Sequence, residues 1–182
     1  VDASGSMGAR QRMVATKGAI QSLLLDSYRM RDKVAMVTFR QQEAHLVLPP
    51  GNSIVYASRL LAELPTGGRT PLAKGLLKGY ETARNCLLRN QAGRPVIMII
   101  TDGRANAPAA PGAAPVDEAF ACARNVCRDE RISWIVIDTE AQGGMTFGLA
   151  QQLSERLGAH YFRIDDLRAE ELTSIAKEFI DA

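Results

Sequence analysis

Two short runs made almost entirely of apolar residues set the strongest limit on how this chain can fold. They are VIMIIT at residues 96–101 and ISWIVI at residues 132–137, and both are rich in β-branched side chains. A strand with apolar residues on both sides is buried on both faces, as in a parallel sheet covered by helices. The sequence therefore predicts a central sheet with a helical layer on each side.

The segments around these runs alternate between strand and helix patterns. Further strands are predicted at residues 34–39, 44–48 and 160–164, and helices at 13–28, 53–64, 71–88, 116–128, 149–157 and around Leu172, Ile175, Ala176 and Phe179. A short polar connection joins the first two of these strands, so they are expected to be antiparallel. The alternation predicts an α/β three-layer sandwich, Rossmann-like, with a mostly parallel central sheet, one antiparallel strand and helices on both faces.

Composition and charge exclude several classes of protein. The 182 residues are 46% hydrophobic, which is typical of a folded globular protein. The formal net charge of +2 is too small to indicate binding to nucleic acid or to an anionic membrane. No apolar run approaches the roughly 20 residues that cross a bilayer. The cysteines Cys86, Cys122 and Cys127 form no Cys-x-x-Cys pair, which favours a reducing compartment. We therefore expect one cytoplasmic domain over residues 1–182.

Oxygen-bearing side chains gather in three loops that follow predicted strands or precede predicted helices. The loops are DASGS at residues 2–6, GGRTP at 67–71 and TDG at 101–103. In an open α/β sheet, ligands collect at the carboxyl ends of the strands, so we expect the three loops to meet at one edge. The candidate cation ligands in them are Asp2, Ser4, Ser6, Thr70 and Asp102.

Two carboxylates and three hydroxyls suit a hard cation, Mg²⁺ or Mn²⁺, which prefers oxygen ligands and keeps several waters. Zinc would favour cysteine or histidine, and neither His45 nor His160 is predicted near these loops. Because the protein would supply at most two negative charges, the ion would still attract a carboxylate from outside. The expected function is an open coordination position that binds an acidic side chain of a partner protein.

Two alternatives remain open for the first loop. Asp and Ser are common helix N-caps, so Asp2, Ser4 or Ser6 could serve only to satisfy free amides before the first helix. A magnesium-dependent phosphotransferase could instead use Asp2 as its nucleophile, although that chemistry wants a second acid nearby and position 4 is Ser. The stretch TGGRTPLAKG has its glycines and lysine in the wrong order for a phosphate loop, so ATP binding is not expected.

Two polar residues after the second acid are candidate partner-binding residues. Arg104 and Asn106 follow Asp102 and are expected to contact an incoming carboxylate or another subunit, since a guanidinium can pair with a carboxylate through two hydrogen bonds. A contact that only stabilises the loop is the alternative for both. Trp134 lies within a buried run and is expected in the core rather than at a ligand.

The Asp-x-Ser-x-Ser stretch, with Thr70 and Asp102, resembles the metal-ion-dependent adhesion site of von Willebrand factor A and integrin I domains. The order of predicted elements resembles that fold over nearly the whole chain. The resemblance implies that Asp2, both serines and Thr70 hold Mg²⁺ directly or through water, and that Asp102 completes the shell. In that fold the first strand ends at the first Asp, so most of it is expected upstream of Val1, in a longer protein.

Longer stretches look like the carboxy-terminal domain of the D subunit of magnesium chelatase and of related cobaltochelatase subunits. They are RDKVAMVTFR at residues 31–40, LPTGGRTPLAKGL at 64–76 and ITDGRAN at 100–106. The resemblance implies a domain without catalytic activity of its own that couples an ATP-hydrolysing ring subunit to a large catalytic subunit, which inserts the metal into a tetrapyrrole. The alternative is an adhesion or assembly module of the von Willebrand factor A type that is unrelated to chelatases.

Overall fold

The computed structural model describes residues 1–3, 29–63, 67–140 and 147–166, together with residues 17, 18, 20, 21, 24, 25 and 27. The described positions from residue 17 to residue 29 are helical, in agreement with the helix expected at 13–28. Ser4, Ser6 and the predicted C-terminal helix lie outside the described residues, so the structure does not test them.

The described strands form an antiparallel pair and a parallel set. β1 (Val34–Arg40) pairs antiparallel with β2 (Glu43–Gly51), while β3 (Val96–Thr101), β4 (Ser133–Asp138) and β5 (His160–Arg163) are parallel in that order. β2 is longer than the expected 44–48 and includes Pro49 and Pro50. Among the described strands β2 pairs on one side only, where a residue without an N–H can be tolerated.

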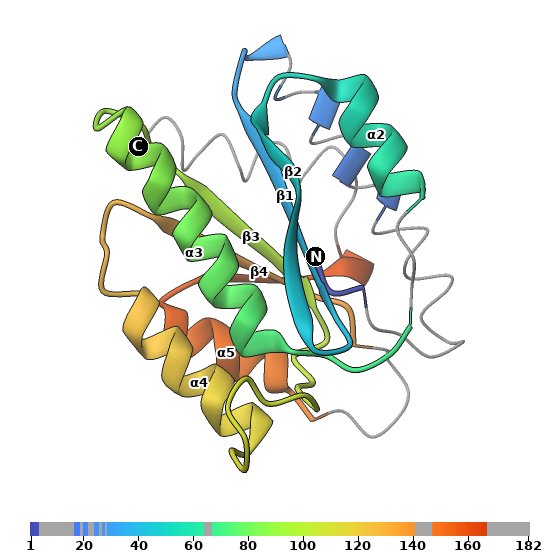
Figure 1. Cartoon of the computed structure of the whole chain (residues 1–182), viewed down its shortest axis with the longest axis vertical. Helices are drawn as coiled ribbons and strands as arrows, with labels where there is room; N and C mark the ends of the chain where they lie inside the picture. Colours follow the sequence, from blue (N-terminus) through green and yellow to red (C-terminus); the bar gives the residue numbers. More distant parts are fainter. Residues whose placement is uncertain are drawn as a thin grey trace.

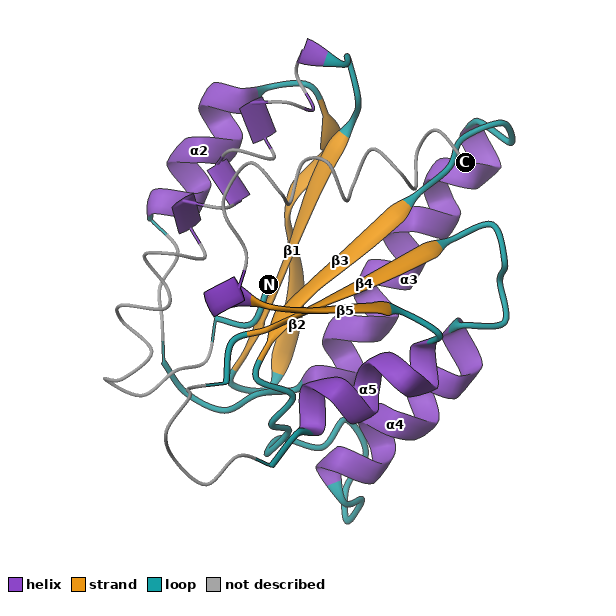
Figure 2. Ribbon diagram, turned by 180° about the vertical axis from the view of Figure 1, so that it is seen from behind, coloured by secondary structure: helices purple, strands orange, loops and turns teal. Residues whose placement is uncertain are grey.

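Residues 1–3 join these two groups of strands into one sheet. Asp2 forms a parallel bridge with Phe39 of β1, and its backbone N–H donates a hydrogen bond of 2.9 Å to the carbonyl of Ile100 in β3. The N-terminus lies beside β1 in both views (Figures 1 and 2). The predicted sheet, mostly parallel with one antiparallel strand, is confirmed.

Helices cover both faces of this sheet. The labelled helices are α2 (Ile54–Ala62), α3 (Leu72–Arg89), α4 (Pro115–Val126) and α5 (Leu149–Leu157). α3, α4 and α5 lie on one face, and α2 lies on the other with the helical positions between residues 17 and 27 (Figures 1 and 2). α5 ends where expected, because Gly158 follows it in the left-handed conformation that ends many helices. The three-layer sandwich is confirmed.

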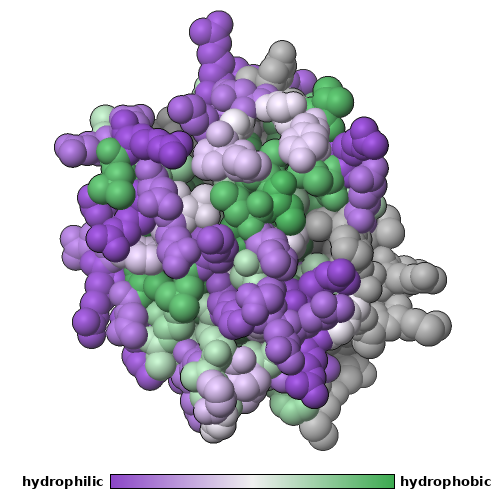
Figure 3. Space-filling model, in the orientation of Figure 1, coloured by the Kyte–Doolittle hydropathy of each residue, from purple (hydrophilic) through white to green (hydrophobic). Residues whose placement is uncertain are grey.

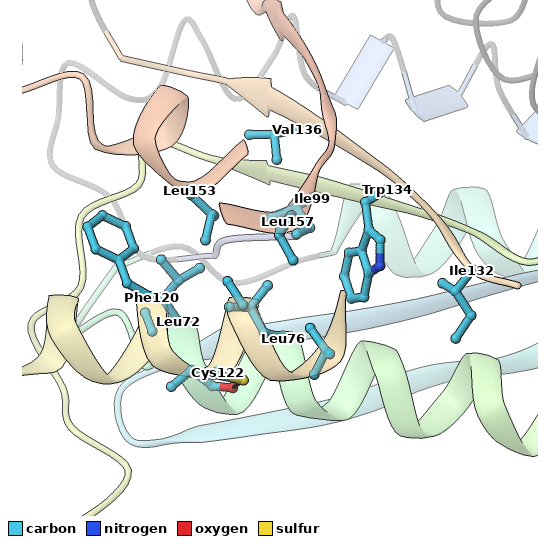
Figure 4. Packing of buried hydrophobic residues seen from close by; sticks show 14 of the residues in the cluster. Leu72, Leu76, Ile99, Phe120, Cys122, Ile132, Trp134, Val136, Leu153 and Leu157 are labelled. Atoms are coloured by element: carbon cyan, nitrogen blue, oxygen red, sulfur yellow. Dashed lines mark hydrogen bonds between the residues drawn. The ribbon is translucent and has the colours of Figure 1, made fainter. Parts of the chain in front are cut away.

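Alternate residues of β3 and β4 face opposite helical layers. Ile99, Trp134 and Val136 pack in one cluster with α3, α4 and α5, and Figure 4 shows their side chains pointing toward those helices. The intervening residues pack in a second cluster on the α2 side, with Ile100, Ile135 and Ile137 as members. Trp134 is 4% exposed, which confirms it as a core residue. Burial on both faces explains why the two runs contain almost no polar residue.

The outer surface is mixed in character. Hydrophilic side chains cover most of the face seen in Figure 3, and a compact apolar area lies over β1 and β2. None of the helices in the described part of the chain is long and apolar enough to pass through a lipid bilayer.

Candidate functional site

Backbone hydrogen bonds bring the three oxygen-bearing loops together at the carboxyl ends of β3 and of the segment at residues 1–3. The N–H of Gly67 donates to the carbonyl of Ala3 at 2.9 Å, which ties the loop before α3 to the N-terminal segment. The N–H of Asn106 donates to the carbonyl of Thr70 at 3.2 Å, which ties the same loop to the one after β3. The described parts of the loops predicted to meet at one edge therefore lie side by side.

Asp2 is nearly buried in this edge, at 8% exposure. The hydroxyl of Thr101, the last residue of β3, donates to Oδ2 of Asp2 at 2.9 Å and accepts a hydrogen bond from the N–H of Gly103 at 3.1 Å. One hydroxyl thus holds both the carboxylate of Asp2 and the turn after β3. The sequence pattern did not single out Thr101, although its place directly before Asp102 was an available signal.

Thr70 is buried and held by Asn106. Its exposure is 3%, and its backbone N–H donates to Oδ1 of Asn106 at 2.7 Å. The chain reaches this position through Gly67 and Gly68, whose φ values of 118° and 101° lie where a side chain would be strained. Asn106 therefore stabilises the loop that carries Thr70, which is the alternative role expected from the sequence. Its contact with a partner stays a prediction.

Asp102 lies at the exposed side of the same edge, with 32% of its side chain accessible. Its Oδ1 accepts a hydrogen bond from the N–H of Arg104 at 3.0 Å. Burial raises the pKa of Asp102, the hydrogen bond and charge of Arg104 oppose the rise, and the nearby Glu140 and Asp138 add to it. Neighbouring carboxylates raise a pKa by repelling the charged form, which a bound cation would stabilise.

Arg104 links Asp102 to Glu140, an acid that the sequence pattern did not single out. Arg104 Nε lies 3.6 Å from Oδ2 of Asp102, and Nη2 lies 3.7 Å from Oε1 of Glu140. The carboxylate of Glu140 also accepts hydrogen bonds from the N–H groups of Phe147 and Gly148, at 3.0 and 3.1 Å. The available signal was position, because Glu140 follows the buried run at 132–137 much as Asp102 follows the one at 96–101.

The carboxylate of Asp138, the last residue of β4, forms hydrogen bonds within the protein. Its carboxylate accepts a hydrogen bond from the N–H of Glu140 at 2.7 Å and another from the hydroxyl of Tyr161. Burial and the hydrogen bond to Asp138 raise the pKa of Tyr161, so the phenol keeps its proton to a higher pH than a free tyrosine does. Asp138 thus joins β4 to β5 and adds to the negative charge near Asp102.

The donors at this edge fit a hard cation. Asp2, Thr70 and Asp102 supply carboxylate and hydroxyl oxygens, and these are the ligand types that Mg²⁺ and Mn²⁺ prefer. No group of three or more His, Cys, Asp or Glu side chains suited to a metal ion occurs among the residues that the structure describes. Zinc prefers cysteine or histidine, so the oxygen donors named here suit Mg²⁺ or Mn²⁺ better than zinc.

Comparisons with known proteins agree with this geometry. The family model for the von Willebrand factor type A domain matches residues 1–104. The uncharacterized protein Rv2850c of Mycobacterium tuberculosis is 45% identical over 172 residues, and the magnesium-chelatase 67 kDa subunit of Chlorobaculum parvum is 39% identical over 186. These alignments cover 94% and 97% of this chain, but the chain spans only 26% and 29% of the two relatives.

Solved structures support the fold. The manganese-loaded TRAP protein of Plasmodium vivax superimposes with a TM-score of 0.71 and 17% sequence identity, over 99% of this chain and 70% of that one. At this level of identity the likeness establishes the arrangement of helices and strands and carries no information about function.

Proposed function

The chain belongs to the von Willebrand factor type A domain family, and from that membership we propose that it binds a partner protein through a divalent cation. The cation would lie at the edge formed by residues 1–3, 67–70 and 101–107. Asp2, Ser4, Ser6, Thr70 and Asp102 would hold Mg²⁺ or Mn²⁺ there. When bound, the ion supplies a positively charged coordination position for an acidic side chain of the partner.

The observation that carries this proposal is the meeting of the three loops, which places Asp2, Thr70 and Asp102 on adjoining hydrogen-bonded segments. The charge of the edge supports it further. Burial raises the pKa of Asp102, the backbone hydrogen bond and the charge of Arg104 lower it, and the neighbouring Glu140 and Asp138 raise it further. A cation at this edge would be attracted by the carboxylates of Asp2 and Asp102 and could bridge them to an acidic side chain of a partner.

We also propose that the domain works in a chelatase-like assembly, where it couples an ATPase ring subunit and a large catalytic subunit to metal insertion into a tetrapyrrole. The 39% identity to a magnesium-chelatase subunit over nearly the whole chain supports this assignment. Arg104 and Asn106 are the proposed partner-binding residues, and Asn106 would use its amide N–H groups because Oδ1 is bonded to Thr70. Free cysteines at positions 86, 122 and 127 suit a cytoplasmic location.

The direct test is calorimetric titration with Mg²⁺ of the wild-type chain and of the Asp2→Ala and Asp102→Ala variants. The control is Glu130→Ala, because Glu130 is exposed and lies before the amino end of β4, whereas the three loops lie at carboxyl ends of strands. We expect the two Asp variants to lose Mg²⁺ binding and the control to retain it, with unchanged circular dichroism. Association with the ATPase ring and catalytic subunits should require Mg²⁺. Association that persists in excess chelator would refute the proposal.

A further inference from the structure

We propose that Arg104 and Phe147 form a second contact surface for the same partner, beside the candidate cation edge. This surface takes a peptide segment in which an acidic side chain and an apolar side chain are two positions apart. The inference rests on the proposed function, because the acidic side chain is the one that the cation would bind. It adds the apolar side chain and its contact with Phe147.

Phe147 is an exposed ring on a fixed backbone. Its exposure is 54%, and it lies two residues before α5. The N–H groups of Phe147 and Gly148 both donate to the carboxylate of Glu140, whose side chain is only 5% exposed. A large aromatic side chain on a backbone that is already ordered loses little conformational freedom when it is covered, so it can contribute strongly to binding.

Arg104 lies between this ring and the cation edge. Its guanidinium carbon is 5.3 Å from the centre of the Phe147 ring, and its side chain is 53% exposed. Its distances to the carboxylates of Asp102 and Glu140 are 3.6 and 3.7 Å, longer than a normal hydrogen bond. The guanidinium is therefore held in place by charge and by the ring, and its N–H groups can reach an incoming carboxylate.

The spacing of the partner's residues follows from the position of Arg104, whose single guanidinium contacts both the Asp102 carboxylate and the Phe147 ring. In an extended segment, side chains two positions apart lie on the same side and about 7 Å from each other. An acidic side chain at the cation edge thus brings an apolar side chain of the same segment to the Phe147 ring. Arginine and aromatic residues commonly dominate the binding energy of interfaces.

The charge of the edge selects a protein segment over a polyanion. Asp102 and Glu140 lie beside Arg104, and Asp138 lies near Asp102; these carboxylates would repel the repeated phosphates of a nucleic acid. One carboxylate bound to a cation, with an apolar neighbour, meets no such penalty. Glu140 acts here as a positioning residue, since it holds the backbone before α5 and the guanidinium of Arg104 through one carboxylate.

The test is a nuclear magnetic resonance titration of the chain in saturating Mg²⁺ with two capped pentapeptides. One peptide carries Glu and Leu two positions apart, the other carries Glu and Ala, and each is made in both orders. We expect the wild-type chain to bind the Leu peptide several-fold more tightly than the Ala peptide. Phe147→Ala should abolish this preference while its Mg²⁺ affinity, measured by calorimetry, stays within about twofold of wild type.

Two further variants separate contact from positioning. Arg104→Lys keeps the charge but loses the planar group above the ring, and should weaken binding of both peptides. Glu140→Gln should reduce the preference for the Leu peptide, a readout that a general loss of stability does not change. Equal binding of both peptides by the wild-type chain in Mg²⁺ overturns this inference and leaves the proposed function standing. Failure of the wild-type chain to bind Mg²⁺ overturns both.

Discussion

Asn106 accepts a hydrogen bond of 2.7 Å through its side-chain oxygen from the backbone N–H of Thr70, while the N–H of Asn106 donates to the carbonyl of Thr70 at 3.2 Å. Two hydrogen bonds of opposite direction therefore join Asn106 and Thr70 across two loops. Replacing Asn106 with Ala should weaken Mg²⁺ binding about tenfold, because residues that orient a ligand typically contribute that much to metal affinity. Calorimetric titration checks this.

The matched control for this prediction is Asn106→Asp, which keeps an oxygen in the same place. It should retain most of the Mg²⁺ affinity that Asn106→Ala loses. If Asn106 contacts only the partner, Asn106→Ala will bind Mg²⁺ like the wild type and lose only partner affinity.

Thr101 is buried at 0% exposure, and its hydroxyl connects Asp2 to the turn at Gly103. Thr101→Val keeps the shape of the side chain but removes both hydrogen bonds, so we expect a loss of about 1–3 kcal/mol in the free energy of unfolding. Thr82→Val is the control, since the Thr82 hydroxyl only bonds the carbonyl of Lys78 within α3 and its loss should cost less than about 0.5 kcal/mol. Urea unfolding measures both, and equal effects would contradict the role of Thr101.

Gly103 lies against the start of α5 with no room for a side chain. A Cβ there would be 2.2 Å from the backbone nitrogen of Ala150, and the φ of 74° is itself unfavourable for other residues. Gly103→Ala should therefore destabilise the fold by roughly 3 kcal/mol or more. Gly112 has a similar φ of 79° but open space around it, so Gly112→Ala should cost only about 1 kcal/mol. Similar melting temperatures for the two variants would show that the contact with α5 is unimportant.

Two glycines of α3 make a second matched pair. A Cβ on Gly75 would lie 2.5 Å from the Phe39 ring, whereas one on Gly79 would lie 3.7 Å from Ile97, an ordinary contact. Gly79→Ala should stabilise the chain by about 0.5–1 kcal/mol through helix propensity. Gly75→Ala should destabilise it by about 1–3 kcal/mol through overpacking against β1. Thermal unfolding measures the stability of both variants. Stabilisation by both would mean that the Phe39 ring moves aside easily.

Cys122 is buried, and burial raises the pKa of its thiol to about 11. The reactive thiolate would then be about a thousandth of the population at pH 8. Cys122 should therefore resist alkylation in the folded chain and react only after denaturation, or as the pH rises toward 11. Peptide mass spectrometry after labelling with iodoacetamide checks this, with Cys86 as the partly exposed comparison. Labelling of Cys122 as fast as Cys86 at pH 8 would contradict it.

Local patterns predicted the elements well where one residue or one run decides the outcome. α5 spans Leu149–Leu157 as expected, because Gly158 ends it in a conformation that favours glycine. Other boundaries differ from the expected ones. α2 stops at Ala62 rather than at Leu64, and Ser53 precedes it without a capping hydrogen bond from its side chain. β2 continues through Pro49 and Pro50. The expected strand ended before these prolines, because the residues of β2 alone do not reveal its pairing with β1.

The sequence by itself determined the layered architecture and the meeting of the three loops, because burial on both faces demands apolar runs and parallel strands end at a common edge. Only the tertiary structure decided which hydrogen bonds hold the residues of the candidate site in place. Thr101 holds Asp2 from 99 positions away, and Asn106 holds Thr70 from 36 away. A hydrogen bond between such distant positions leaves no periodic pattern in the chain, since it forms only after the packing of the sheet has brought its two groups together.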